Sequence, residues 1–281
     1  MIKTLVVSGC SFTMGGGLDN PNYHNLFESN ALKEDGKTWN TKIAGRDGRK
    51  FCEKNNWGYY LHKLLNLRKE NYKNFAIGGG GLFRSIQSIY TFIRSYDGNP
   101  SELQIIYQIP SVTRFELTEI HTDCRLFKSI VNSDEDANHL RTWVKYFQNT
   151  ETDWLRTLLE VDKLNMMCKA KGIPLILIDW NREFTKDMTR TMISMLMKQN
   201  DNSLKSLYRQ ITDNHYDKAS IPFESIINDF PLFDVHKLIK NPKNRIHTIV
   251  DDEVVVIDNH LDPNGAKLLG NYIFKKKFKE N

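Results

Sequence analysis

Five apolar segments of the chain have the length and composition of buried β-strands. They are rich in valine, isoleucine, leucine and aromatic residues, and turn residues bound them. Helical patterns fall between them, so we expect a parallel sheet of five strands with helices on its faces. The predicted strands are Thr4–Val7, Tyr72–Ile77, Leu103–Ile109, Ile173–Ile178 and Glu253–Ile257.

Amphipathic patterns in the intervals between these strands predict helices. Each is long enough to connect one parallel strand to the next. The last helix has the clearest start, because Asp262 is a favoured N-cap residue and Pro263 suits the first helical position. The predicted helices are Trp57–Leu67, Leu82–Ser95, Thr152–Lys171 and Pro263–Lys277.

Three long polar and aromatic stretches fall outside the alternating pattern, at residues 18–56, 111–151 and 181–248. They are neither repetitive nor of low complexity, so we expect structured insertions. The third carries helical patterns of its own, at Lys186–Gln199 and Ser203–Ile211. All three begin at or shortly after the carboxyl ends of strands, where doubly wound sheets bind ligands. We therefore expect them to determine specificity.

The composition is typical of a soluble globular protein. The 281 residues are 40% hydrophobic, enough for the core of a single domain over residues 1–281. No apolar run approaches the roughly 20 residues of a membrane span and no signal peptide is recognised, so we expect a cytoplasmic protein. The net charge of +5 is modest and scattered, and we expect no nucleic-acid partner. Four cysteines without CxxC spacing indicate free thiols: Cys10, Cys52, Cys124 and Cys168.

The first predicted strand runs directly into a turn that holds two candidate nucleophiles. Cys10 and Ser11 are adjacent, and a glycine cluster follows in SGCSFTMGGG. A lipoprotein leader would need an apolar core of roughly 7–15 residues, whereas only Leu5–Val7 precedes the turn. A serine just past a buried strand presents its hydroxyl beside backbone N–H groups that can face an oxyanion. Capping of the next helix is the other role open to it.

Three further stretches place polar groups at the ends of predicted strands. NFAIGGGG puts Asn74 at a strand end and Gly79 in a loop where backbone can approach a ligand closely. IIYQIPSVTRFE ends the third strand in polar side chains. DNHLDPNGAKLLGNYI puts His260 before the final helix, with Asp258 two residues earlier.

These four blocks, in this order, resemble those of the SGNH or GDSL-like hydrolase family. GCSFT stands where the family has its Gly-Asp-Ser block, and HLDPNGAKLLGNYI is similar to its histidine block. The resemblance implies a three-layer α/β/α, flavodoxin-like fold and a serine hydrolase with no cofactor and no metal. It implies that Ser11 is the nucleophile and His260 the general base. The N–H groups of Ser11 and Gly79 would bind the oxyanion.

Two features depart from the family pattern. The family's acid usually lies three residues before the histidine, which here is Ile257, so Asp258 is the best candidate. The usual asparagine after the third strand is also absent, and counting from the strand puts Ser111 in its place. Gln108 is an alternative amide donor, and Arg114 is a charged alternative.

Other chemistries have weaker support. Cys10 is a second candidate nucleophile, because thiols are intrinsically reactive. The Gly78–Gly81 run lacks the Gly-Lys-Ser/Thr of a P-loop, which argues against nucleotide binding. His121, Asp123 and Cys124 have no second ligand pair at zinc-like spacing, so a metal site is not expected.

The sequence therefore predicts a serine esterase acting on a small-molecule or carbohydrate ester. Carbohydrate O-acetyl groups are favoured because polar and aromatic insertions suit sugar faces, and Trp180 is expected to line the crevice. The alternative is a domain of weak or no activity that serves as a binding or structural module, for instance in a virion or a surface-modification assembly. The missing asparagine supports that alternative. The sequence leaves the oligomeric state open.

Overall fold

The centre of the fold is a parallel sheet whose order is β2-β1-β3-β6. The computed structural model describes residues 2–18, 50–77, 81–111, 116–121, 124–129, 150–198 and 226–279. In spatial order the strands are β2 (Tyr72–Asn74), β1 (Thr4–Ser8), β3 (Leu103–Ile109) and β6 (Leu175–Asp179). The chain leaves β1 toward β2 on one side and later adds β3 on the other. A topological switch point therefore lies at the carboxyl end of β1.

The strands are in register across the sheet, and the most buried one is central. Val6 of β1 lies opposite Lys73 of β2 and Ile105 of β3, and Ile105 lies opposite Leu175 of β6. All seven residues of β3 are buried. A strand with both faces covered by helices requires such a continuous apolar run, which is the pattern visible in the sequence.

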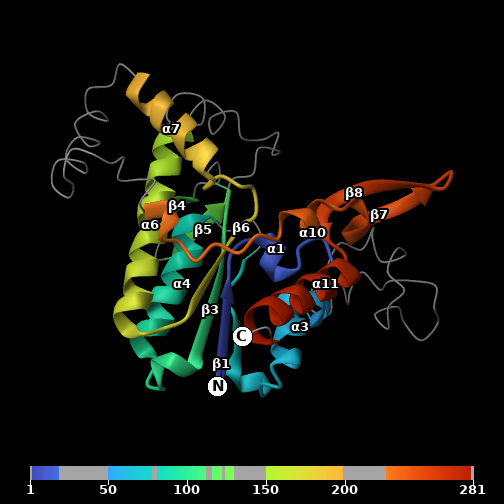
Figure 1. The fold of residues 1–281 in the computed structure, drawn as a ribbon, viewed down its shortest axis with the longest axis horizontal. Coiled ribbons are helices and arrows are strands. Elements are labelled where there is room, and N and C mark those ends of the chain that lie inside the picture. Colours follow the sequence, from blue (N-terminus) through green and yellow to red (C-terminus); the bar gives the residue numbers. More distant parts are fainter. Residues whose placement is uncertain are drawn as a thin grey trace.

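Helices cover both faces of the sheet and give three layers (Figure 1). On one face, Val6 packs in a core with residues of α4 (Leu82–Ser95) and α6 (Thr150–Lys171). On the other face, Leu5 and Val7 pack with residues of α3 (Trp57–Leu64) and α11 (Pro263–Phe274). Successive side chains of a strand point to opposite faces, so β1 contributes to both cores. The predicted α/β/α architecture is confirmed.

Several predicted boundaries are confirmed closely. The helix Leu82–Ser95 has the predicted bounds, and α7 spans Lys186–Lys198. Asp262 caps α11, because its carboxylate accepts a hydrogen bond of 2.6 Å from Gly265 N–H. The helix ends at Phe274, and a π-helical turn, η5, continues over Lys275–Lys279. The predicted helix Ser203–Ile211 lies outside the described residues.

The fifth predicted strand does not belong to the parallel sheet, which corrects the expectation of five parallel strands. It is β8 (Glu253–Leu261), which pairs antiparallel with β7 (Arg245–Val250) in a separate hairpin. Asp251 and Asp252 form the connection with φ of 50° and 63°, the left-handed geometry of tight hairpin turns. The hairpin extends away from the three layers (Figure 1). The valine-rich sequence of β8 predicted a strand of the parallel sheet, whereas its residues alternate between exposed and half-buried as far as the buried Leu261.

The position beside β6 is taken by a different segment. Leu232 forms a parallel bridge with Leu177, and Phe233 N–H donates to the Leu177 carbonyl at 2.8 Å. Pro231 accepts from Leu177 N–H on the other side, at 3.0 Å. The parallel sheet is thus extended beyond β6 by a short segment inside the third predicted insertion.

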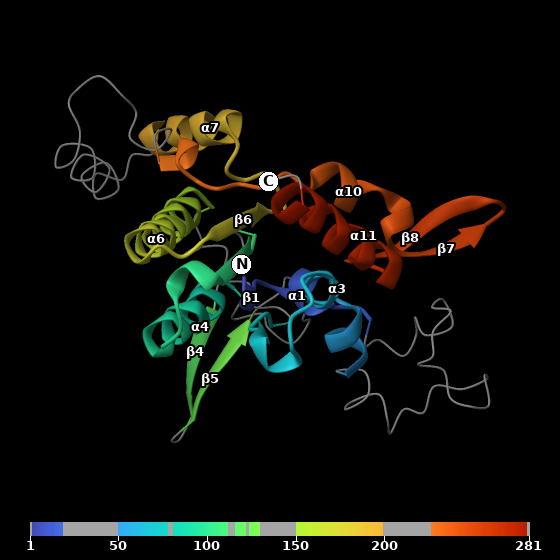
Figure 2. The ribbon, with the colours of Figure 1, turned by 60° about the horizontal axis from the view of Figure 1, so that its bottom comes forward.

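The insertions also contain elements that the sequence did not reveal. A second antiparallel hairpin, β4 (Glu116–His121) and β5 (Cys124–Ser129), lies beside α4 (Figure 2).

The remaining short elements are α1 (Ser11–Met14), a helix at residues 50–55, η2 (Lys69–Asn71), η3 (Pro100–Glu102), α10 (His236–Lys240) and η4 (Pro242–Asn244). Among the described helices, none has both the length and the apolar character to cross a bilayer.

Candidate active site

Ser11 lies at the carboxyl edge of the sheet, as the first residue of α1. The strand β1 ends at Ser8, and Cys10 is the N-cap of the short helix. The first N–H groups of a helix have no carbonyl partner within it, so the Ser11 N–H is available to an acceptor from outside. The Ser11 residue keeps 8% of its surface exposed. The β1–α1 turn therefore presents a hydroxyl and a backbone donor together, next to the switch point.

Asp258 and His260 approach Ser11 from β8. Side chains two residues apart in a strand point to the same face, whereas neighbouring residues point to opposite faces. Asp258 and His260 are both half-buried. Ile257, the residue before Asp258, lies on the other face of the strand and is 43% exposed. An acid at the family's three-residue spacing would thus point away from the site. The two-residue spacing of this chain puts Asp258 and His260 on the same, half-buried face of β8.

The pairing of β7 with β8 is irregular beside His260. Ile246 pairs with Asp258, and the next pair is Arg245 with Leu261, so Asn259 and His260 have no ladder partner. The His260 N–H instead donates to Asp258 Oδ1 at 2.9 Å. Bulges of this kind re-aim side chains and are common beside active sites. Here the bulge holds His260 over α1.

The three side chains form a continuous hydrogen-bonded relay. Ser11 Oγ lies 2.7 Å from His260 Nε2, and His260 Nδ1 lies 2.5 Å from Asp258 Oδ1. Burial raises the pKa of Asp258, but the hydrogen bonds and charge of His260 outweigh it and leave the pKa below its ordinary value. Asp258 is therefore ionised at neutral pH and accepts a hydrogen bond from His260 Nδ1–H. That tautomer leaves Nε2 free to accept the Ser11 hydroxyl proton.

The Phe12 ring packs between the histidine ring and Trp180 in a chain of ring contacts. The Phe12 ring lies 4.6 Å from the His260 ring and 4.0 Å from the Trp180 ring, centroid to centroid. Trp180, predicted to line the crevice, is 7% exposed and packs against Phe12. Phe12 is a contact that the sequence did not single out. Its place directly after Ser11 is the only sequence signal for it.

Gln108 holds the nucleophile turn from the neighbouring strand. Its Oε1 accepts from Cys10 N–H at 2.9 Å, from the Cys10 thiol at 3.1 Å and from the Thr13 hydroxyl at 3.3 Å. Its Nε2 donates to the Ile109 carbonyl at 2.7 Å. The buried amide therefore uses both ends within the fold, and its oxygen faces the turn.

Of the other predicted oxyanion donors, the structure describes Ser111. The Ser111 hydroxyl donates to Glu183 Oε1 at 3.0 Å, so it is engaged with the loop after β6. Gly79 and Arg114 lie outside the described residues. Asn74, at the end of β2, donates from Nδ2 to the Thr13 carbonyl at 3.3 Å and thereby also supports the nucleophile turn.

The structure gives little support to a thiol nucleophile or to a metal site in the described residues. Cys10 is 1% exposed, and its thiol donates to Gln108. Cys10, Cys52 and Cys168 are free thiols. His121 pairs with Cys124 at the end of the β4–β5 hairpin, and Asp123 lies outside the described residues. Across the described ranges, no group of three or more histidine, cysteine or acidic residues could hold a metal ion.

Gly17 is a second neighbour of the relay that the sequence did not assign. Its φ is +80°, and a Cβ added there would lie 3.1 Å from Asp258 Oδ2 and 2.7 Å from Ile246 Cδ1. The residue lets the chain pass close to the carboxylate. The run of three glycines after Ser11 was the sequence signal for such a close approach.

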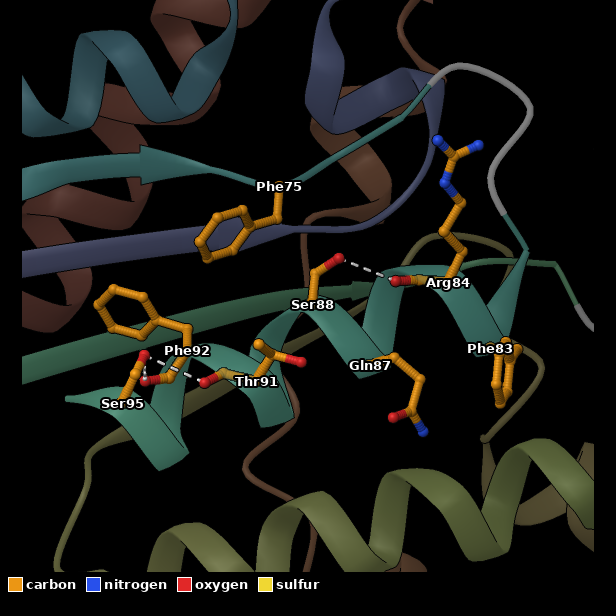
Figure 3. Close-up of a pocket in the computed structure, with 8 residues that line it drawn as sticks. All are labelled: Phe75, Phe83, Arg84, Gln87, Ser88, Thr91, Phe92 and Ser95. Carbon is orange, nitrogen blue, oxygen red and sulfur yellow. Dashed lines mark hydrogen bonds between the residues drawn. The ribbon is translucent and has the colours of Figure 1, made fainter. Parts of the chain in front are cut away.

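A separate hollow lies along α4 and contains none of the relay residues (Figure 3). Phe75, Phe83 and Phe92 give it apolar walls. The Ser88 hydroxyl donates to the Arg84 carbonyl at 3.0 Å, so it is tied to its own helix. The residues that line it include no histidine, aspartate or glutamate that could act as a general base.

Similarity to known proteins is found among solved structures. No model of a known protein family matches the chain, and no curated protein does. Among solved structures, the chain is similar to a member of the lipolytic protein G-D-S-L family from Veillonella parvula. The two chains are 10% identical, each is covered over 99% of its length, and the TM-score is 0.44.

Proposed function

We propose that this chain is a serine ester hydrolase of the SGNH type. Ser11 is the nucleophile, His260 the general base, and Asp258 the acid that orients His260. The observation that carries the proposal is the relay from Ser11 Oγ to His260 Nε2 at 2.7 Å and from His260 Nδ1 to Asp258 Oδ1 at 2.5 Å. These distances suit proton transfer from a hydroxyl to a base held in one tautomer.

The proposed reaction has two stages. In the first, His260 Nε2 takes the Ser11 proton while Oγ attacks the ester carbonyl carbon. The tetrahedral intermediate then breaks its bond to the alcohol, which leaves with the proton from His260. In the second stage, His260 takes a proton from water while the water oxygen attacks the acyl carbon. The bond from that carbon to Ser11 Oγ then breaks, Oγ takes the proton back from His260, and the carboxylic acid leaves. Asp258 stabilises the imidazolium that forms in both stages.

For the oxyanion we propose backbone donors. The Ser11 N–H belongs to the first residue of α1 and lies beside the hydroxyl of the same residue. The Gly79 N–H stays the predicted second donor. We assign Gln108 a positioning role, because its amide is committed to Cys10, Thr13 and Ile109. It fixes the turn from which Ser11 projects, and the turn is what places the hydroxyl.

For the substrate we propose an ester of a small acyl group, with carbohydrate O-acetyl groups the favoured class. The 8% exposure of Ser11 supports a small acyl group, because little of the nucleophile is open to a bulky one. Hydrolysis of 4-nitrophenyl acetate should therefore be faster than hydrolysis of the octanoate ester. Release of acetate from acetylated sugars tests the alcohol side directly.

The test of the function compares two adjacent substitutions. We expect Ser11→Ala to remove hydrolysis of 4-nitrophenyl acetate, with a loss of at least about 10³-fold in kcat. Cys10→Ala keeps the backbone N–H that Gln108 binds and should retain most of the activity. The reverse outcome would make the chain a thiol enzyme. A folded wild-type protein without turnover of any ester would favour the binding-module alternative.

A further inference from the structure

We infer that Gly16 is a positioning residue of this site, because a side chain there would press Ser11 and His260 apart. The inference rests on the proposed function of these two residues. It concerns a residue whose lack of a side chain leaves room for both members of the reacting pair, and which takes no part in the proton transfer.

The backbone at Gly16 does not itself require glycine. Among the glycines that the structure describes, those with positive φ are Gly9, Gly15, Gly17 and Gly172, and Gly16 is not one of them. An alanine could adopt its φ without strain. The reason for glycine at this position must therefore be the space around it.

That space is occupied by the catalytic pair. A Cβ added at Gly16 would lie 2.7 Å from Ser11 Cβ, 3.0 Å from His260 Nε2 and 3.1 Å from His260 Cδ2. Carbon atoms that are not bonded pack at about 3.5–4.0 Å. The ideal position of the methyl group is thus too close to both residues at once.

The imidazole is the neighbour that can give way, whereas the contact of 2.7 Å with Ser11 Cβ persists and pushes the added methyl group toward the ring. Ser11 is anchored, because its carbonyl accepts from Gly15 N–H at 2.9 Å and from Gly16 N–H at 2.6 Å. Its Cβ is one bond from this backbone and has little freedom. The His260 ring sits at the end of a side chain and can shift, and the shift lengthens the contact from Nε2 to Ser11 Oγ.

A longer contact acts on the chemical step. Proton transfer needs a heavy-atom distance of about 2.6–3.2 Å. The contacts of 3.0 and 3.1 Å require the ring to shift by a few tenths of an ångström, whereas a misplacement of about 1 Å costs about 10²-fold in rate. We therefore expect Gly16→Ala to lower kcat by about fivefold to tenfold and to change KM by less than about twofold, because substrate binding does not depend on that distance.

The matched control is Gly172→Ala, in the turn after α6. Gly172 has φ +67°, and an added Cβ meets no described atom within 4 Å. The control should lower the melting temperature through backbone strain and leave kcat unchanged. A Gly16→Ala protein with full kcat would overturn the inference.

A double-mutant cycle tests the contact without any assay of activity. Urea unfolding is measured for Gly16→Ala and Gly172→Ala, each in the wild-type and the His260→Ala backgrounds. Gly16→Ala should lower the urea midpoint less in the His260→Ala background, because the ring that it presses against is gone. Gly172→Ala should lower it equally in both.

Equal losses from Gly16→Ala in the two backgrounds would overturn the inference. If Gly16→Ala alone does not fold, recovery of folded protein in the double variant supports the inference, and failure of both overturns it. If the wild-type protein hydrolyses no ester, the cycle alone decides the role of Gly16. The failure of the proposed function is then distinguished from the failure of this inference.

Discussion

Asp258→Asn tests the part of the relay that departs most from the family pattern. The substitution keeps the size of the side chain and removes its charge. Asp258 Oδ1 accepts from both His260 N–H, at 2.9 Å, and His260 Nδ1–H, at 2.5 Å. An asparagine can present its amide oxygen to these donors, or its NH₂ group, which would impose the wrong tautomer on His260.

The expected loss follows from the hydrogen bond that is weakened. A hydrogen bond to a charged group contributes roughly 1.5–3 kcal/mol, and each 1.36 kcal/mol is a factor of ten in rate. The loss of charge alone therefore predicts a fall in kcat of about 10- to 150-fold. The Asp258 side chain is 21% exposed, so solvent screening favours the lower part of that range. A wrong tautomer would raise the loss toward the roughly 10⁴-fold known for well-studied triads.

The assay measures kcat and the melting temperature on the same protein. Asp251→Asn is the matched control, because Asp251 is exposed in the hairpin turn with φ 50° and asparagine tolerates that conformation. The control should change neither quantity appreciably. A destabilised but fully active Asp258→Asn protein would refute the reasoning. It would show that Asp258 only braces the strand before α11.

The pH dependence of stability gives a second readout of the same carboxylate. The pKa of Asp258 in the folded protein lies below its ordinary value of 3.8. Its contribution to stability is therefore present above about pH 4 and is lost as the pH falls through the lower folded value. Asp258→Asn should lose less melting temperature than the wild type over that acid range. Parallel curves would contradict the assigned interaction.

Two further substitutions extend these predictions. His260→Ala should lower kcat nearly as much as Ser11→Ala. The double variant should have about the same kcat as either single variant, because the effects of residues in one catalytic unit are not additive. A kcat of the double variant that falls by the product of the two single losses would contradict the relay. Gln108→Ala should destabilise the protein by about 2–4 kcal/mol in urea unfolding, since it leaves the buried Cys10 N–H without its acceptor and opens a cavity. It should also lower kcat more than it raises KM, and full kcat would remove Gln108 from the positioning of Ser11.

The layered core was predictable because its signals are local. The buried strand β3 is a mostly apolar run, and the cap of α11 is recognisable from Asp262 followed directly by Pro263. The hairpin was missed because the valine run of β8 matches a buried strand as well as an alternating one. Its signal was the Asp251–Asp252 pair between two β-branched segments, which favours a two-residue turn.

The site was predictable as a set of blocks but not in its contacts. Ser11 and His260 are 249 positions apart, and their approach depends on how the hairpin leaves the sheet. The direction of the Gln108 amide depends on the register that sets Ser8 opposite Tyr107. The crowding at Gly16 arises only when β8 lies over α1. Such pairings are properties of the packed chain and leave no periodic trace in the sequence.

The central claim is that Ser11 is an activated nucleophile, and covalent labelling tests it most directly. A fluorophosphonate probe reacts with a serine whose proton a neighbouring base can take. The account predicts stoichiometric labelling of the wild-type chain at neutral pH, located on Ser11 by mass spectrometry of its peptides. Labelling should disappear in Ser11→Ala and persist in Cys10→Ala. A folded wild-type protein that takes up no probe, or takes it up at a residue other than Ser11, would contradict the account.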